Sequence, residues 1–321
     1  METTENESPL KDCRSIPDLW FPDATLVLRA ENTLFRVYPG ILSTRSTVFG
    51  DMIAVPQPAQ PEGETLDGHP VVFMHDSAAE VEVFLRALYD SSYFMPPPTP
   101  MDVPSITGIM RLAHKYDVPY LFRRALTHLE THFPTTLLDF MLNMKSCRGL
   151  TLGSVHDNLI TIHAASEVGA TWLLPSAYYS TCTFSVQELL TPNQSWAALS
   201  IDQQQTCLAA QAKLSRATAR IFRFLRDIPA PGCSSMATCQ ASISEAQDTL
   251  ENRIDRELDT NPLAFNLKKT AAKLCGLCRH LATERCTEAQ DLFWQSLPGM
   301  LGLSTWDDLR RKRGEVLDAD G

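Results

Sequence analysis

Several kinds of sequence feature are missing from this chain of 321 residues. No stretch approaches the 18 consecutive apolar residues that a membrane-spanning helix requires. Glycine is scarce, with 14 residues, so there is little material for a ligand-cradling loop. Phosphate-binding loops, a dinucleotide fingerprint, a Gly-x-Ser-x-Gly elbow and paired-carboxylate motifs are also missing from the sequence. We therefore expect no catalytic residues, no cofactor and no enzymatic activity.

Basic residues are too few to favour binding to phosphate-rich partners. Lysine and arginine total 28 against 38 aspartates and glutamates, which gives a net charge of −10 and a pI of about 5.3. The acidic excess is concentrated in residues 1–133, which contain 10 basic and 18 acidic residues. A chain with this balance repels phosphate as a whole, and we expect neither a nucleic acid nor a membrane surface as its partner.

The opening residues and the cysteine content both favour an intracellular location. The start, Met1-Glu-Thr-Thr-Glu-Asn-Glu-Ser8, has no apolar core of the kind that a signal peptide carries. The nine cysteines are odd in number and scattered, which is typical of reduced thiols rather than a disulfide framework. We expect an intracellular protein, cytoplasmic or nuclear, with a flexible acidic N-terminus over residues 1–19.

Strand-like patterns are confined to the first third of the chain. Residues 24–29 and 34–38, joined by the polar pair Glu31-Asn32, predict a β-hairpin, and residues 71–74 predict a third short strand. Residues 39–43 predict at most a short helical turn. Ser77 and Glu80 have the spacing of a capping box and predict the start of a helix. Further helices are expected over residues 44–54, 105–116 and 118–133.

The character of the sequence changes after Pro134, where strand-like alternation disappears and helix starts recur. Ser185, Ser200 and Ser242 are each followed three residues later by Glu or Gln, as in a capping box. The expected helices span residues 152–169, 184–190, 202–227, 240–258, 268–282, 287–296 and 304–314. The fold class is therefore α+β up to about residue 133, followed by an all-α region over residues 134–321.

Five blocks of residues, in this order, resemble the BTB/POZ domain. They are Asp23-Ala-Thr-Leu-Val-Leu28, Phe35-Arg-Val-Tyr38, Ile41-Leu42-Ser43-x-x-Ser46-x-Val48-Phe49, Val81-x-x-Phe84-Leu85-x-x-Leu88-Tyr89 and Ile109-Met-x-Leu112-Ala113-x-Lys115-Tyr116-x-Val118-x-x-Leu121. The resemblance covers residues 20–133 and implies a short three-stranded sheet with a cluster of helices. The tail, ending in Trp294-x-x-Leu297-Pro298 and Gly302-Leu303-x-x-Trp306, is similar to the tails of BTB proteins from mushroom-forming fungi.

The resemblance implies a non-enzymatic protein-interaction module that forms homo- or hetero-oligomers, with a homodimer expected. Two alternatives remain open: a substrate adaptor that binds a cullin scaffold, and a transcriptional regulator. The helix ending near Ala54 lacks the hydrophobic-x-Glu element of cullin-binding members, and no DNA-binding module accompanies the domain. Tyr38 stands where the family usually has His. Residues 1–19 show no β pattern for the strand that the family exchanges between subunits.

The spacing of apolar residues provides both a predicted core and a physical reason for self-association. The predicted core positions are Leu26, Leu28, Phe35, Leu42, Phe49, Phe84, Leu85, Leu88, Leu112 and Ala113. The segment 41–53 has more apolar residues than one inward-facing stripe needs: Ile41, Leu42, Val48, Phe49, Met52 and Ile53. Some of them must pack on the tail of the chain or face a second copy of it.

Four cysteines are weak candidates for metal ligands, although we assign no metal site from the sequence. Cys275-x2-Cys278 has a spacing that lets two thiolates reach one zinc ion, with His280 and Cys286 nearby in the sequence. Cys233 and Cys239 are separated by five residues, a looser spacing. Because the sequence around Cys275 has a helical pattern, we favour buried core thiols over structural zinc, and both over a redox pair.

Three other polar patterns have a plain structural interpretation. His128 and His132 are spaced i, i+4, but Glu130 points about 200° away on the helix, and we interpret the pair as an exposed helix end. A basic stripe, Lys213, Arg216, Arg220 and Arg223, lies opposite an apolar face and indicates a solvated helix surface. The run 310–313 follows two aspartates and complements a helix C-terminus, although it also fits a nuclear-import signal.

Overall fold

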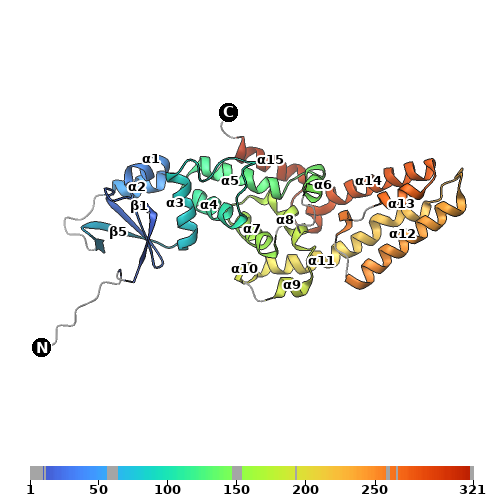
Figure 1. Ribbon diagram of the computed structural model, residues 1–321, viewed down its shortest axis with the longest axis horizontal. Coiled ribbons are helices and arrows are strands. Elements are labelled where there is room, and N and C mark those ends of the chain that lie inside the picture. Colours follow the sequence, from blue (N-terminus) through green and yellow to red (C-terminus); the bar gives the residue numbers. More distant parts are fainter. Residues whose placement is uncertain are drawn as a thin grey trace. The chain divides into compact units, whose positions relative to one another are not determined.

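The computed structural model describes residue 10 and residues 12–55, 64–146, 154–191, 194–257, 261–264 and 267–318. The fold is mixed α+β, with a five-stranded sheet near the N-terminus followed by many helices (Figure 1). The chain forms two compact units, residues 1–131 and 132–321, which we call the N-terminal unit and the C-terminal unit. Their boundary lies two residues before the boundary at 133/134 expected from the sequence.

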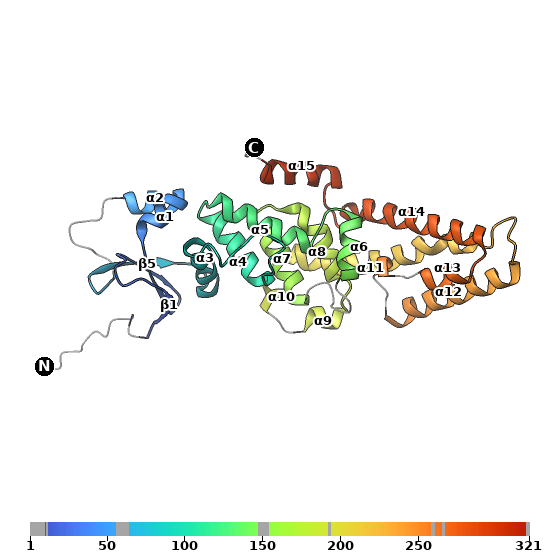
Figure 2. The same cartoon turned by 45° about the horizontal axis from the view of Figure 1, so that its top comes forward.

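The N-terminal unit contains all five strands. Its elements are β1 (Arg14–Trp20), β2 (Leu26–Ala30), β3 (Thr33–Val37), α1 (Pro39–Arg45), α2 (Thr47–Ala54), β4 (Thr65–Leu66), β5 (His69–Met74), α3 (Ala78–Tyr89), α4 (Val103–Lys115) and α5 (Pro119–His132). The strand order is β1-β3-β2-β5-β4, with β2–β3 and β4–β5 antiparallel and the other pairs parallel. The helices are grouped beside the sheet within this unit (Figure 2).

The predicted hairpin and third strand are confirmed. Leu28 on β2 lies opposite Phe35 on β3, and both side chains are buried. Glu31, in the turn between them, has a φ of 49°, the left-handed conformation that a tight hairpin requires. On its other side β2 pairs in parallel with β5, where Leu28 is opposite Val72. All ten core positions predicted for this unit are buried, which confirms the register of the strands and helices.

The sheet is larger than the three strands predicted, because β1 and β4 extend it at both ends. The expectation that residues 1–19 form a flexible segment without β pattern was wrong for Arg14–Trp20, which pairs in parallel with β3. Its buried residues, Ile16 and Leu19, are three apart because the register shifts between Ser15 and Trp20. The strand therefore lacks the period-2 alternation by which a sequence reveals strands. Residues 1–9 lie outside the described part of the chain.

The C-terminal unit is formed by helices. They are α6 (Leu137–Ser146), α7 (Val155–Glu167), η1 (Thr171–Leu173), α8 (Leu174–Thr181), α9 (Val186–Leu190), α10 (Gln194–Ala198), α11 (Ile201–Ile221), η2 (Phe222–Asp227), α12 (Met236–Glu257), η3 (Pro262–Ala264), α13 (Lys268–Lys273), α14 (Gly276–Met300) and α15 (Trp306–Leu317), where η marks a 3-10 helix. The capping boxes predicted at Ser185 and Ser200 are present. Ser242 instead lies inside α12, where its hydroxyl donates to the Thr238 carbonyl.

An aromatic cluster fills the core of the C-terminal unit. The rings of Trp294 and Trp306 stack with centroids 5.2 Å apart, and the Trp306 indole N–H donates to the Trp294 carbonyl at 2.7 Å. Phe140 on α6 packs against Trp294 at 5.0 Å and against Tyr179 on α8 at 5.3 Å. These contacts join helices that are far apart in the sequence. The tryptophans of the tail, Trp294 and Trp306, thus provide core residues, which is a structural role.

The predicted helices 268–282 and 287–296 are divided at a different point in the structure, and this change matters for the cysteines. The predictions 268–282 and 287–296 are wrong as separate helices, because α13 ends at Lys273 and a single helix, α14, then spans Gly276–Met300. The chain breaks at Leu274 and Cys275, both in extended conformation. Residues 39–43 also form more than a turn, because α1 extends through Arg45.

Candidate functional sites

Helices α1 and α2 of the N-terminal unit expose part of the apolar surplus predicted for them. Leu42 and Phe49 are buried in the core of the unit. Of the remaining predicted residues, Ile41 and Val48 are exposed, at 39% and 41%, and Met52 and Ile53 are half-buried. Val55, which follows α2 and was not part of the prediction, is 59% exposed. We call the three exposed residues, Ile41, Val48 and Val55, the α1–α2 apolar set. Single exposed apolar residues are common on proteins, but three within one short segment make it a candidate interaction surface.

The α1–α2 segment is fixed to the unit at the junction between its two helices. Ser46 caps α2, because its hydroxyl accepts a hydrogen bond from the Phe49 amide at 3.0 Å and also donates to the Tyr116 carbonyl. The Thr47 hydroxyl donates to the Asp117 carboxylate at 2.5 Å. The Phe49 ring stacks on Tyr116 with centroids 4.6 Å apart. The exposed side chains are therefore presented by a rigid support.

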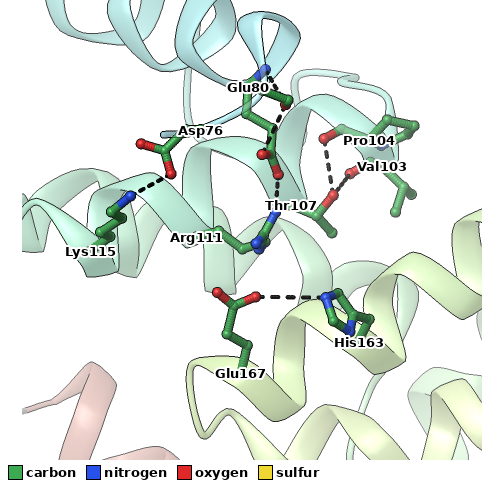
Figure 3. Close-up of polar contacts among 10 residues, drawn as sticks. Asp76, Glu80, Val103, Pro104, Thr107, Arg111, Lys115, His163 and Glu167 are labelled. Carbon is green, nitrogen blue, oxygen red and sulfur yellow. Dashed lines mark hydrogen bonds and ion pairs between the residues drawn. The ribbon is translucent and has the colours of Figure 1, made fainter. Parts of the chain in front are cut away.

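Charged residues between α3 and α4 form paired contacts within the N-terminal unit (Figure 3). Asp76 accepts from the Lys115 ammonium at 2.6 Å and from the Tyr116 hydroxyl at 2.5 Å. Arg111 forms an ion pair with Glu80, in the first turn of α3. Burial, together with the hydrogen bond to Asp76, raises the pKa of Tyr116. Each of these charges has a structural partner within the N-terminal unit.

The C-terminal unit brings together the four cysteines that the sequence offered as weak metal candidates. Cys233 lies in the turn after η2, and Cys239 lies in the first turn of α12. Cys275 is the N-cap of α14 and Cys278 lies in the first turn of that helix. The predicted helix over 268–282 placed Cys275 inside a helix, and the break after Lys273 instead turns it toward the other three. We call these four residues the cysteine cluster.

The sulfur atoms of the cysteine cluster are close enough to share one small ion. All four Sγ atoms lie within 4.8 Å of one another, and the Cys233 and Cys275 Sγ atoms are 3.7 Å apart. Cys239 and Cys278 are fully buried, whereas Cys233 and Cys275 are half-buried. Among the described residues this is the one group of three or more His, Cys, Asp or Glu side chains that converges in a way suited to a metal.

Backbone amides point at two of these sulfur atoms. The Ser235 amide donates to Cys233 Sγ at 3.4 Å, and the Cys275 amide donates to Cys239 Sγ at 3.2 Å. Such hydrogen bonds orient a thiolate and stabilise its charge. The backbone amide of Cys278 lowers the pKa of Cys275 to about 6, while burial raises the pKa of Cys278 to about 12. Of these two thiols, Cys275 is therefore the one whose thiolate form is favoured.

Other cysteines of the C-terminal unit fit the core-thiol interpretation that the sequence favoured for the cluster. Cys182 and Cys207 are fully buried, and Cys182 Sγ donates to the Cys207 carbonyl at 3.6 Å. Burial raises the pKa of Cys207 to about 12 and that of Cys286 to about 11. His280 is exposed on α14 and, like Cys286, lies outside the converging group. Cys182, Cys207 and Cys286 are therefore buried core thiols outside the cluster. For the cluster itself, the preference for core thiols over structural zinc stays a prediction.

The two histidines at i, i+4 spacing lie in different environments. His128 is buried, and its Nε2 lies 2.7 Å from the Met95 carbonyl while its ring stacks on Phe94 at 4.9 Å. His132 is exposed. The interpretation as an exposed helix end was therefore wrong for His128, which is a core residue held by a hydrogen bond. Its burial reflects a tertiary contact with the segment before α4, which the i, i+4 spacing does not reveal.

The predicted basic stripe is exposed on α11 and η2, as expected for a solvated face. Lys213, Arg216 and Arg220 also line a pocket of about 490 Å³ between α11 and α14. Its opposite wall includes Leu292, which is 72% exposed, and the buried ring of Phe293. The Lys213 ammonium donates to the Met300 carbonyl at 2.7 Å. This helix face is thus both basic and partly apolar.

The basic run near the C-terminus is partly neutralised by its own helix. Arg310 pairs with Asp307 at 2.8 Å and Arg311 pairs with Asp308 at 3.0 Å, both at i, i+3 spacing on α15. Asp308 also accepts from the Thr305 hydroxyl that caps the helix. These exposed pairs provide local helix stabilisation.

One polar pair was not anticipated from the sequence. His156 Nδ1 is hydrogen-bonded to the Ser195 hydroxyl, and Ser195 is buried. A nucleophilic serine needs a base that is itself held by a third group. Within the described residues, no carboxylate contacts His156, so the pair lacks that orienting group. The 39-residue separation explains why no local motif revealed it.

Comparisons with known proteins return no relative for this chain. No family model, no curated protein and no solved structure matches it. Within the described residues, no helix is both long enough and apolar enough to cross a membrane.

Proposed function

We propose that this chain is a non-enzymatic protein-interaction module whose N-terminal unit is a BTB/POZ-type domain that pairs with a second copy of the chain. The observation that carries the proposal is the α1–α2 apolar set, which is exposed on a segment held rigidly against α4. Apolar side chains left in water on a fixed surface gain free energy when a partner covers them.

The arrangement of the N-terminal unit supports the assignment of the domain type. The hairpin β2–β3, the two short helices, the parallel strand β5 and the helices α3, α4 and α5 follow one another in the order that the resemblance implies. The blocks that carry the resemblance supply buried core residues of this unit. Tyr38, which replaces the usual His, donates from its hydroxyl to Asp23 at 2.5 Å, so the substitution is accommodated by a hydrogen bond.

The edges of the sheet favour the helical surface over strand exchange as the contact between copies. Strand β1 lies at one end of the sheet and already pairs with β3 of its own chain. It also contains Pro17 and Asp18, a residue without a backbone donor and a charged residue. Both residue types discourage pairing along an edge strand. No observation favours the cullin-adaptor or transcriptional alternatives.

Sedimentation of the full chain at micromolar concentration tests the proposal. The wild-type chain is expected to sediment at twice its mass of 35.8 kDa, whereas Val48→Glu places a charge in the contact and is expected to give a monomer. The matched control is Leu208→Glu on α11, because Leu208 has nearly the same exposure, 40% against 41%. A monomeric wild-type chain, or equal dissociation by both variants, would contradict the proposal.

A further inference from the structure

We propose that the cysteine cluster binds one zinc ion in a structural tetrathiolate site that ties the start of α12 to the start of α14. The proposal is independent of the function proposed for the N-terminal unit, because all four residues belong to the C-terminal unit. Its basis is the convergence of Cys233, Cys239, Cys275 and Cys278.

The sulfur–sulfur distance fits a zinc site better than a disulfide. In a tetrahedron with Zn–S bonds of about 2.3 Å, neighbouring sulfur atoms are separated by about 3.8 Å. The Cys233 and Cys275 Sγ atoms are 3.7 Å apart. A disulfide requires about 2.05 Å between its sulfur atoms. The side chains are thus spaced for a shared ligand, and not for a bond between themselves.

The donor set selects the class of metal. Four thiolates form a soft, sulfur-only site, which suits zinc or a single iron and disfavours calcium and magnesium. With four protein ligands the tetrahedron is complete and leaves no open position for water or substrate, as in structural zinc sites. Binding releases one proton from each thiol that is still protonated, and no electron is transferred.

The backbone around the cluster supports the four ligands. The amides of Ser235 and Cys275 donate to sulfur atoms, which compensates part of the negative charge of a tetrathiolate site. Gly232, with a φ of 86°, lets the chain turn into Cys233 in a conformation that other residues rarely adopt. Cys275 begins α14, so its thiolate lies at the positive end of a helix dipole.

The helices around the cluster provide a physical reason for a metal cross-link. The first part of α14, through Gln290, buries only small side chains on its inner face: Cys278, Ala282 and Cys286. Neither α12 nor residues 276–292 of α14 contain a Phe, Tyr or Trp residue, in contrast to the cluster around Trp294. Small side chains bury little apolar area, so the first part of α14 gains less from the hydrophobic effect than its second part, which buries Phe293 and Trp294. Zinc would join two segments 42 residues apart and add its binding free energy to folding.

Metal analysis of the full chain, purified with a reductant and without chelator, tests the site directly. We expect about one zinc per chain, and we expect Co²⁺ added to the metal-stripped chain to give the visible absorption of a tetrahedral thiolate complex. A reduced chain that holds no zinc and gives no such spectrum would overturn the proposal, as would bound iron in place of zinc.

Variants assign the metal to these four residues. Cys275→Ser combined with Cys278→Ser is expected to reduce the zinc content from about one to near zero. Cys286→Ser is the matched control, because it removes another buried thiol from the same helix and is expected to retain the zinc. Zinc retained by the double variant, or lost only in the control, would show that the metal binds elsewhere.

A measurement on the wild-type chain avoids variants that fail to fold. Alkylation followed by peptide mass mapping should find the four cluster thiols protected with zinc bound and reactive after chelation. Hydrogen exchange in α12 should accelerate in the same step, because the cross-link is lost. Cluster thiols that react equally fast before and after chelation, or a Cys233–Cys275 disulfide in the reduced preparation, would contradict the proposal.

Discussion

The two units are stabilised by different kinds of secondary structure and of buried side chain. The N-terminal unit combines a five-stranded sheet with helices whose inner faces are rich in Leu, Phe and Ile. The C-terminal unit has an aromatic core around Trp294 and Trp306, while the first part of its helix α14 buries small side chains and contributes two thiols to the cysteine cluster. The two units thus differ in the kind of side chain that they bury, and the first part of α14 is where the proposed zinc site would add to stability.

Substitution of the stacked tryptophan should give the largest effect. Trp294→Ala removes a buried ring that contacts Trp306 and Phe140, and we expect unfolding of the C-terminal unit to become easier by about 3–5 kcal/mol. Denaturant unfolding with hydrogen exchange, resolved by segment, measures this change. An equal loss of protection from hydrogen exchange in the N-terminal and C-terminal units would show that the two units are not stabilised by separate cores.

Phe84→Ala is the counterpart in the N-terminal unit, with an expected cost of about 3–5 kcal/mol. Phe84 is fully buried, and its ring lies 5.8 Å from that of Tyr116. The same segment-resolved experiment should find the loss of protection in residues 12–131. A change below about 1 kcal/mol would mean that the cavity collapses and that this core is less tightly packed than its burial indicates.

Ser46→Ala should have an intermediate effect, of about 1–2 kcal/mol. The variant removes the N-cap of α2 and leaves the Tyr116 carbonyl without the hydroxyl donor of Ser46. Ser43→Ala is the control, because the exposed Ser43 hydroxyl donates only to Gly40 in its own helix at 3.2 Å. Equal costs for the two variants, measured by denaturant unfolding, would show that the junction does not fix the α1–α2 segment.

The stability of the N-terminal unit should also show a small dependence on pH that arises from Asp23. The hydrogen bond from the Tyr38 hydroxyl lowers the pKa of Asp23. A carboxylate whose pKa is lower in the folded state stabilises that state above its unfolded pKa of about 3.9, and the contribution is lost as the pH falls through the folded pKa. Asp23→Asn and Tyr38→Phe should therefore reduce the acid sensitivity of the N-terminal unit between about pH 5 and 2. Unchanged pH profiles would mean that the pair is too well solvated to contribute.

The sequence predicted the elements that local patterns determine. The hairpin, α3, α4 and α5 have alternation or helical spacing, with caps such as Ser77, whose hydroxyl accepts from the Glu80 amide. Strand β1 was missed because its register shift hides the alternation. Helix α8 was missed because all eight of its residues are buried, so that no polar face shows the helical period. Its placement depends on neighbours distant in the sequence.

The candidate sites also differ in how far local sequence patterns predict them. The apolar surplus of α1 and α2 was visible in the sequence, because the number of apolar residues on a helix is a local property. The cysteine cluster was only a weak signal, because its two halves are 42 residues apart and the spacing of Cys233 and Cys239 is loose. The turn that exposes Cys275 to the other thiols begins α14 without a Ser, Thr, Asp or Asn cap, so no residue type marked the break.

The tryptophans are distributed unequally between the two units, and the intrinsic fluorescence of the protein is therefore unequal as well. The chain has five, of which Trp172, Trp196, Trp294 and Trp306 belong to the C-terminal unit and only Trp20, on β1, belongs to the N-terminal unit. Intrinsic fluorescence therefore reports mainly on the helices, and a chain carrying Trp20→Phe emits tryptophan light from the C-terminal unit alone. Subtracting its signal from that of the wild-type chain leaves the emission of a single indole at the edge of the sheet, which turns the first strand into a spectroscopic probe.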